Sequence, residues 1–299
     1  MTNTDDNQIL PQPHIGLPMW NHRDWHGQWF TTGPSAPSEI SQYSSVFNTI
    51  EGNTTFYSLP SEDQIKKWRD SVPPNFKFTF KLHQDITHKS KLGENIGLLH
   101  QQMELVSHVG NQLGQILIQL PKAFSPDELP LLDTLLASSA LQGYSCAVEV
   151  RHPLFFAKGE QEIALNQCLL SHQANRIIMD TRALFSGPAN DAITIDVRQK
   201  KPRVPVNVIA TGNNPTLRFV GNNDHDINVK CLAPWYAKCH QWRNEGKTPY
   251  LFFHMPDNKD APWLAQFFVN TYNQRYASSP IAHLPIPARQ TQNGLFDFD

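Results

Sequence analysis

Residues 76–82 read FKFTFKL, a run in which apolar side chains alternate with lysine or threonine at every second position. This period of two is typical of a β-strand that turns one face toward a core. A segment with helical periodicity follows at residues 94–113, and Gly114 is expected to end it. The chain repeats this order, a short strand and then a helix, along most of its length.

Eight strand-length runs are predicted in total. They lie at residues 14–20, 48–57, 76–82, 115–121, 146–152, 176–182, 216–221 and 249–257. Predicted helices occupy residues 38–47, 61–72, 94–113, 125–139, 160–173, 229–246 and 260–276, the second opened by a capping box of Ser61 and Gln64. Eight such units over about 250 residues favour a single TIM-type (β/α)8 barrel of the α/β class.

A doubly wound open sheet is the alternative to the barrel. It is disfavoured because no glycine-rich phosphate-binding loop follows the first strand. Residues 183–215 are rich in glycine, proline and asparagine, which predicts an irregular insertion or a small hairpin before the seventh strand. This insertion is too short and polar to form a second domain.

The bulk composition describes a globular protein. Of 299 residues, 39% are hydrophobic and 17% are charged, and the net charge of −2 argues against a broad nucleic-acid-binding surface. The polar, acidic start of the chain is unlike a secretory signal, and no apolar run approaches a membrane span, so a cytoplasmic protein is expected. The expected domains are a flexible N-terminus (1–13), the barrel (14–280), and a proline-spaced linker with a terminal peptide (281–299).

The four cysteines, Cys146, Cys168, Cys231 and Cys239, form no C-x-x-C pair. We therefore expect reduced thiols rather than a disulfide framework or a zinc site.

Polar side chains stand at or just past the C-terminal ends of most predicted strands. They are Glu51, Asn53, Lys81, Gln119, Glu149, Arg151, His152, Asp180, Arg182, His254, Asp257 and Asn258, with Arg218 inside the seventh strand. In a parallel barrel these ends share one rim, where active sites of this fold lie. Alternation places Glu149 and Arg151 on one face of their strand, and Asp180 and Arg182 on one face of theirs. A structural network of ion pairs is the alternative interpretation.

Aromatic residues accompany this rim. Trp20, Trp25 and Trp29 follow the first strand, and Phe56 and Tyr57 follow the second. Trp20, Trp25 and Tyr57 are candidates for stacking on a sugar or a base. They could instead pack a long first loop onto the barrel.

Four basic side chains are predicted to converge on the mouth of the barrel: Lys81, Arg151, Arg182 and Arg218. Guanidinium groups suit phosphate or carboxylate oxygens, which predicts a small anionic or nucleotide-like ligand. Asn53, Gln119, His152 and Asn258 complete the predicted ligand-binding set. An enzyme at this site, for example a hydrolase, would use Glu51 and Glu149 as general acid and base. Asp180, His88, His152 or His254 would stand beside them.

Three further readings of the same residues stay open. A divalent metal held by Glu51, Glu149, Asp180 and a histidine is conceivable, but the interspersed cations and the lack of an H-E-x-x-H motif disfavour it. Two carboxylates under a tryptophan-rich rim would also suit a glycoside hydrolase. The third reading is a non-catalytic anion-binding or adaptor protein.

Several stretches together resemble a known family. They are IGLPMWNHRDWHGQWF, FNTIEGNTTFY, FKFTFKLHQDITH, ILIQLP, CAVEVRHPLF and LFFHMPDN, between residues 14 and 276. In this order they resemble the YecE-like family, domain of unknown function 72. The resemblance implies a TIM-type barrel and no particular activity. This chain departs from the family in having His254-Met255-Pro256-Asp257-Asn258 where many members have an asparagine pair, and in a longer segment before the seventh strand.

The chain ends in QTQNGLFDFD, residues 290–299, after a proline-spaced run at residues 284–287. Gln292, Leu295 and Phe296 fit the pattern Q-x-x-L-F, which resembles the short peptide that bacterial DNA-processing proteins insert into the replication sliding clamp. Two apolar anchors and one amide on a stiff spacer suit such a tethered peptide. The alternative is that this tail fills a groove of its own barrel.

Overall fold

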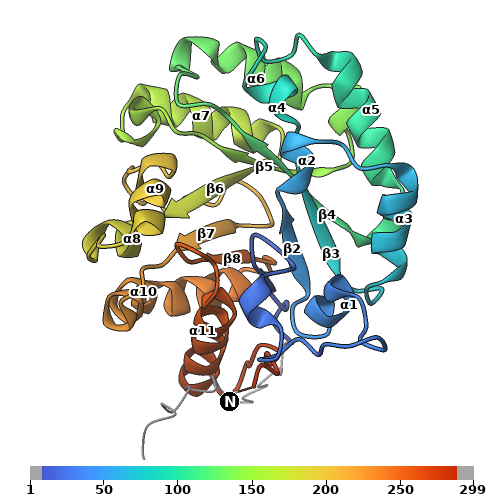
Figure 1. Ribbon diagram of the computed structural model, residues 1–299. Helices are drawn as coiled ribbons and strands as arrows, with labels where there is room; N and C mark the ends of the chain where they lie inside the picture. Colours follow the sequence, from blue (N-terminus) through green and yellow to red (C-terminus); the bar gives the residue numbers. More distant parts are fainter. Residues whose placement is uncertain (1–8, 288–299) are drawn as a thin grey trace, which may run out of the picture.

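A computed structural model describes residues 9–287 of the protein (Figure 1). Eight parallel strands form one sheet in the order β1-β8-β7-β6-β5-β4-β3-β2. Their bounds are β1 His14–Gly16, β2 Thr49–Gly52, β3 Lys77–Lys81, β4 Leu113–Gln119, β5 Ser145–Glu149, β6 Asn175–Asp180, β7 Thr216–Val220 and β8 Tyr250–His254. The predicted TIM-type barrel is confirmed.

The barrel closes between its first two strands. Glu51 at the end of β2 donates its backbone N–H to Leu17 O at 3.0 Å, just after β1. Tyr43 strengthens this seam, because its hydroxyl accepts the Leu17 N–H at 2.8 Å and donates to Thr49 O at 2.9 Å. Gly16 is required here, since a Cβ at this position would lie 2.3 Å from Thr49 O.

Helices surround the strands on the outside of the ring (Figure 1). Their bounds are α1 Glu39–Ser44, α2 Thr54–Tyr57, α3 Glu62–Asp70, α4 Gln84–Thr87, α5 Ile96–Ser107, α6 Leu129–Leu136, α7 Glu160–Ser171, α8 Arg182–Ser186, α9 Ala192–Lys200, α10 His225–Asn244 and α11 Ala261–Arg275. The capping box of Ser61 and Gln64 is present at the start of α3. None of the helices in residues 9–287 combines the length and apolar character that a membrane span requires.

The helix expected at residues 94–113 is shorter in the structure, where α5 ends at Ser107. Gly110, with a φ of +58°, turns the chain, and β4 begins at Leu113. Gly114 lies inside that strand, where a Cβ would lie 3.0 Å from Phe78 O and from the Tyr250 hydroxyl. The prediction that Gly114 ends the helix is therefore wrong.

The insertion at residues 183–215 is more regular than predicted, because it contains α9 and most of α8. Asp191 caps α9, since its carboxylate accepts the Thr194 N–H at 2.7 Å. After α9 the chain continues without helix or strand through residues 201–215, back to the start of β7.

Both ends of the described chain pack against the helical layer. Arg243 on α10 donates to Pro11 O at 2.7 Å and to Ser279 O at 2.6 Å, so it joins the two ends. Beyond it, residues 281–287 lie along α11, with Ile281, Leu284 and Ile286 buried. Residues 10–13 and 281–287 therefore pack against the barrel.

Candidate functional site

A buried ion-pair network forms where the strands end at the mouth of the barrel. Arg218, in the middle of β7, donates to both oxygens of Glu51 at 2.7 and 2.8 Å. The same guanidinium also donates to Glu149 at the end of β5. Glu51 and Glu149 are each 1% exposed and Arg218 is 5% exposed. One cation from the interior of the barrel thus joins two carboxylates from distant strands.

Both carboxyl groups are held in the ionised form. Burial alone would raise the pKa of Glu51, but Arg218 and His254 bring this pKa well below its usual value. Burial likewise opposes ionisation of Glu149, and Arg151, Arg218 and Lys81 together lower its pKa to about 2. Neither group can act as a general acid near neutral pH.

His254, the last residue of β8, contacts Glu51 in this network. Its Nε2 lies 3.1 Å from Glu51 Oε2, and Asn53 Nδ2 donates to Glu51 Oε1 at 2.8 Å. Burial and the nearby cations Lys201 and Arg218 outweigh Glu51 and lower the pKa of His254 to about 4. Because Glu51 is ionised, Nε2 carries the proton, and Nδ1 keeps a free lone pair.

A second group of side chains lies beside the first, at the ends of β3 and β4. Lys81 Nζ donates to Gln119 Oε1 at 2.8 Å and stands 3.9 Å from the centre of the Phe56 ring. Gln119 Nε2 lies 3.5 Å from His88 Nε2. Burial and the neighbouring Arg218 lower the pKa of Lys81 to about 8, and burial and Lys81 lower the pKa of His88 to about 4.

Arg151 connects the network to solvent. Its Nε and Nη2 both donate to Glu149 Oε1, at 2.7 and 2.6 Å, and its side chain is 18% exposed. An arginine has five N–H donors, so this geometry leaves donors of Arg151 for an external anion.

Lys201, which the sequence did not single out, is half-buried and interacts electrostatically with Arg218 and both glutamates of the network. It follows α9 in the insertion, and the adjacent Pro202 O accepts a hydrogen bond from Thr181 Oγ1 at 3.1 Å. Burial and the charge of Arg218 lower the pKa of Lys201 to about 7, partly offset by Glu51 and Glu149. The extra length before the seventh strand was the signal in the sequence, but it identified no residue.

Asp180 and Arg182 do not join the mouth, which corrects the prediction that they point into it. Asp180 turns outward to the helical layer, where it accepts the Trp235 Nε1–H at 2.7 Å and pairs with Arg182. Arg182 is the first residue of α8 and also donates to Cys231 O on α10. Strand alternation itself explains this direction, because Asp180 shares the outward face of β6 with Ile178, whereas Met179, paired with Arg218, faces the barrel interior.

Three other predicted ligand-binding residues have structural roles. Trp25 is fully buried, and its Nε1 donates to Lys259 O at 2.9 Å, which fastens the first loop to the last one. Trp20 packs edge-on against Trp68 of α3, with ring centres 5.1 Å apart. Asn258 accepts the Met255 N–H at 3.0 Å and shapes the loop after β8 with a φ of +61°.

Tyr57 and His152 lie next to site residues. Tyr57 is 69% exposed and packs edge-on against Phe56, the ring beneath Lys81. His152 directly follows Arg151, and its Nδ1 accepts the Leu154 N–H at 3.4 Å at the start of a short 3-10 turn, Pro153–Phe156. Gln292, Leu295 and Phe296 lie outside the described residues.

Comparison with known proteins agrees with the strand count and the motifs. A family model described as "Protein of unknown function DUF72" matches residues 14–290. The chain belongs to the DUF72 family. This DUF72 protein is 38% identical over 252 residues to the UPF0759 protein YecE of Escherichia coli K12, covering 84% of this chain and 89% of YecE. The protein of that name from Escherichia coli O157:H7 matches to the same extent.

Solved structures support the fold. A DUF72 family protein of Enterococcus faecalis V583 superposes with a TM-score of 0.67 at 17% identity, over 89% of this DUF72 chain and 99% of that one. A second crystal structure of that protein gives the same TM-score over 93% of this chain and 99% of that one. At this identity the likeness shows the barrel alone.

Proposed function

We propose that the barrel mouth binds a small anion with a phosphate or carboxylate group, and that the protein is an enzyme acting on it. The observation that carries this proposal is the local charge. Four cationic side chains stand around two ionised carboxylates: Arg151, Arg218, Lys81 and Lys201 around Glu51 and Glu149. When both lysines are protonated, two positive charges remain unmatched. A buried excess of this kind is stabilised by an anion.

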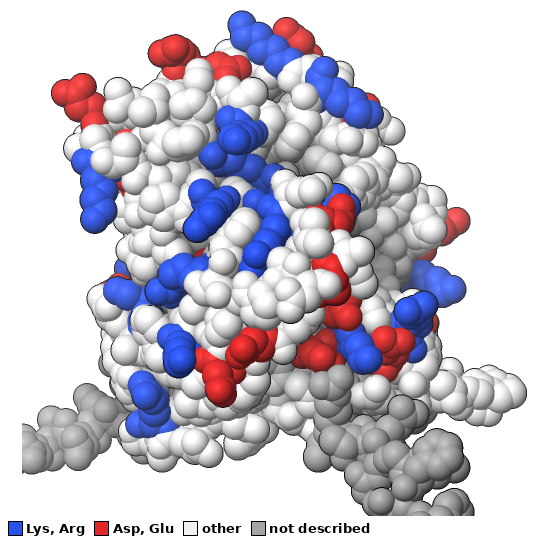
Figure 2. All heavy atoms as spheres, turned by 60° about the vertical axis from the view of Figure 1, so that its left-hand side comes forward, with Lys and Arg blue, Asp and Glu red and all other residues white. Residues whose placement is uncertain are grey.

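The view of the surface agrees with this charge excess. In Figure 2, Lys and Arg side chains gather around the middle of the face that is turned forward, and Asp and Glu side chains lie mostly toward its edges. Such an arrangement attracts a negatively charged ligand to the face before any specific contact forms.

The cations divide into two roles by their contacts. Arg218 directs its donors at Glu51 and Glu149, so it holds the network together. Arg151 keeps free donors, and Lys201 and Lys81 carry three donors each, so these three side chains are the proposed anion contacts.

His254 is the proposed proton acceptor. Glu51 orients the imidazole through Nε2, which leaves Nδ1 to take a proton from water or from a substrate hydroxyl. Lys201 is one of the groups that depress the pKa of His254. An anion bound against Lys201 would screen that charge and raise the pKa of His254 toward neutrality. Binding would thereby prepare the base for the reaction.

This assignment favours a hydrolase or another proton-transfer enzyme over the two alternatives. Glycoside hydrolysis needs one carboxyl group that stays protonated near neutral pH, whereas both glutamates have low pKa values. A divalent metal would need the glutamate oxygens that Arg218 and Arg151 occupy. Asp180, the third expected ligand, faces α10.

The test compares two neighbouring lysines. Lys201→Met should weaken binding of inorganic phosphate at pH 6.5 by about tenfold or more, because a charged hydrogen bond is lost. Lys200→Met is the matched control, since Lys200 is exposed and pairs with Asp196 on its own helix. Calorimetric titration of both full-length variants gives the affinities. Equal losses in the two variants, or none in Lys201→Met, would reject the proposed anion site.

A second variant separates an enzyme from a binding protein. His254→Gln should keep phosphate affinity within a few fold and lose turnover against a panel of phosphate esters that the wild-type protein hydrolyses. If no ester or other phosphorylated compound in a broad panel is turned over by the wild type, while phosphate still binds at Lys201, the non-catalytic alternative is favoured.

We also propose, from the Q-x-x-L-F pattern alone, that Gln292, Leu295 and Phe296 bind a DNA sliding clamp. The packed chain reaches Pro287, whose carbonyl accepts the Trp263 Nε1–H at 3.1 Å. Only a few residues therefore separate this anchored position from the pattern.

A further inference from the structure

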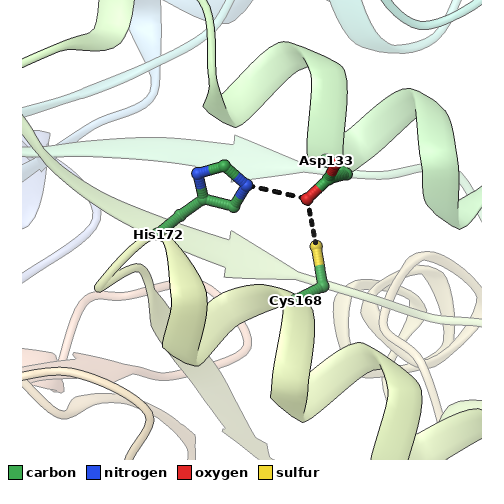
Figure 3. Close-up of side chains that lie close together, drawn as sticks. All are labelled: Asp133, Cys168 and His172. Carbon is green, nitrogen blue, oxygen red and sulfur yellow. Dashed lines mark hydrogen bonds and ion pairs between the residues drawn. The ribbon is translucent and has the colours of Figure 1, made fainter.

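Three side chains that can ligate a metal lie together on the outer wall of the barrel, apart from the mouth. Asp133 is on α6, Cys168 is on α7 and His172 directly follows α7; one ligand atom of each lies within 4.8 Å of the other two. Figure 3 shows the three side chains pointing toward one another. Because β6 begins shortly after His172, the group lies at the end of the barrel where the strands start, opposite the mouth.

The local geometry follows from helix periodicity and from packing between two helices. Cys168 and His172 are four residues apart, so they share one face of α7. Asp133 reaches them from α6, where its Oδ1 lies 2.8 Å from His172 Nε2 and 3.8 Å from Cys168 Sγ.

The arrangement does not suit a nucleophilic cysteine. In such sites the imidazole contacts the thiol and takes its proton. Here the Asp133 carboxylate lies between the two, and burial together with Asp133 raises the pKa of Cys168 to about 11. The thiol is therefore protonated and weakly reactive.

We propose that Asp133 Oδ1, Cys168 Sγ and His172 Nε2 bind a Zn²⁺ ion. Oxygen, sulfur and nitrogen ligands of these kinds are the ones zinc takes in proteins, at about 2.0–2.3 Å. The thiolate and the carboxylate together balance the two positive charges of the ion. The side chains are half-buried or exposed, so small rotations bring the three atoms around one centre.

Three protein ligands leave a fourth tetrahedral position open, as in sites where zinc holds water or a ligand group. His172 also lines a polar cleft of about 560 Å³ with Ser145, Gln173, Asn213 and Asn214. Water, or a polar group of a molecule in that cleft, can complete the coordination.

The binding step is balanced without any change of oxidation state. The Cys168 S–H bond breaks, a sulfur–zinc bond forms and the proton passes to solvent. His172 binds through the Nε2 lone pair of its neutral ring, with the remaining proton on Nδ1.

Cobalt(II) is the probe, because a thiolate ligand gives it a near-ultraviolet charge-transfer band. Full-length protein should bind one equivalent of Co²⁺ with this band, and one equivalent of Zn²⁺ should abolish it. Cys168→Ser should remove the band and weaken Zn²⁺ binding by about 100-fold. Asp133→Asn, at an exposed position that does not endanger folding, should weaken it by about tenfold or more.

Cys231→Ser is the matched control, since Cys231 is also a half-buried free thiol on a helix, away from Asp133. This variant should keep the band and the affinity. The proposal is overturned if wild-type protein shows no sulfur band at micromolar concentrations, if Cys168→Ser and Asp133→Asn bind Zn²⁺ as the wild type does, or if Cys231→Ser loses the band. Phosphate binding at the mouth does not bear on this outcome.

Discussion

Arg218 organises two acidic groups that are far apart in the sequence. It lies in an apolar strand, between Met179 and Phe252 of the neighbouring strands. A guanidinium in such a position requires anionic partners, and its planar fork satisfies Glu51 with two bonds and Glu149 with a third. The charged residue in the middle of TLRFVG was therefore a strong signal in the sequence. Its partners, Glu51 and Glu149 at the ends of β2 and β5, were among the residues predicted at the rim, but the pairing itself is seen only in the structure.

At the same scale, the lowered pKa values of two lysines predict how anion binding depends on pH. The pKa of Lys201 is about 7 and that of Lys81 is about 8, so both are charged below these values and neutral above them. Affinity for sulfate, which stays a dianion throughout, should fall by about tenfold or more between pH 6.5 and 9. Calorimetry over this range measures it. In Lys201→Met, sulfate affinity should depend less on pH at the low end of this range. A wild-type affinity that stays constant or rises with pH would contradict the assignment.

Among the elements, α8 and α9 decide which side chains reach the mouth. α8 begins at Arg182, which pairs with the outward-facing Asp180 and donates to Cys231 O on α10. The chain after α9 brings the charge of Lys201 close enough to act on Arg218 and Glu51, and Thr181 Oγ1 donates a hydrogen bond to the adjacent Pro202 O. An insertion that the sequence marks only as irregular thus supplies a cation of the site.

Thr181→Val tests this role of the element, because it removes the hydrogen bond and keeps the shape of the side chain. Phosphate affinity at pH 6.5 should fall by roughly three- to tenfold, as expected for about 1 kcal/mol. In the Lys201→Met background the same change should have almost no further effect, since the two residues act on one interaction. An equal loss in both backgrounds would mean that Thr181 acts elsewhere.

On the scale of the whole molecule, the two ends of the described chain meet on the outside of the barrel. Arg243 is 1% exposed and ties Pro11 to Ser279, and residues 281–287 cover α11 with three buried aliphatic side chains. The proline-spaced run, expected to serve as a stiff spacer, packs against α11 as far as Pro287.

Two truncations test this packing and the proposed tail. A chain ending at Pro280 loses Ile281, Leu284 and Ile286, so we expect a loss of about 3 kcal/mol and a melting temperature lower by roughly 6–12 °C. A chain ending at Pro287 should melt as the full chain does. It should also lose binding to a DNA sliding clamp, which fluorescence anisotropy with full-length protein detects. If the chain ending at Pro287 melts earlier and the full chain does not bind clamp, the tail packs on its own barrel.

The sequence by itself determined the barrel and the inward-facing core of the site. Alternation within a strand and the shared direction of parallel strands are local rules, and they were enough to bring Glu51, Glu149, Arg151 and Lys81 to one rim with Arg218 below them. His254 followed from the same reasoning, because it ends the eighth strand.

Only the tertiary structure decided which residues outside the strands join or leave a site. The position of Lys201 and the meeting of Asp133 with Cys168 and His172 depend on how helices and connections pack. Cys168 and His172 show a helical spacing in the sequence, but the ligand that completes the group comes from another helix. No local period encodes such contacts, because they are set by the distance and rotation between elements.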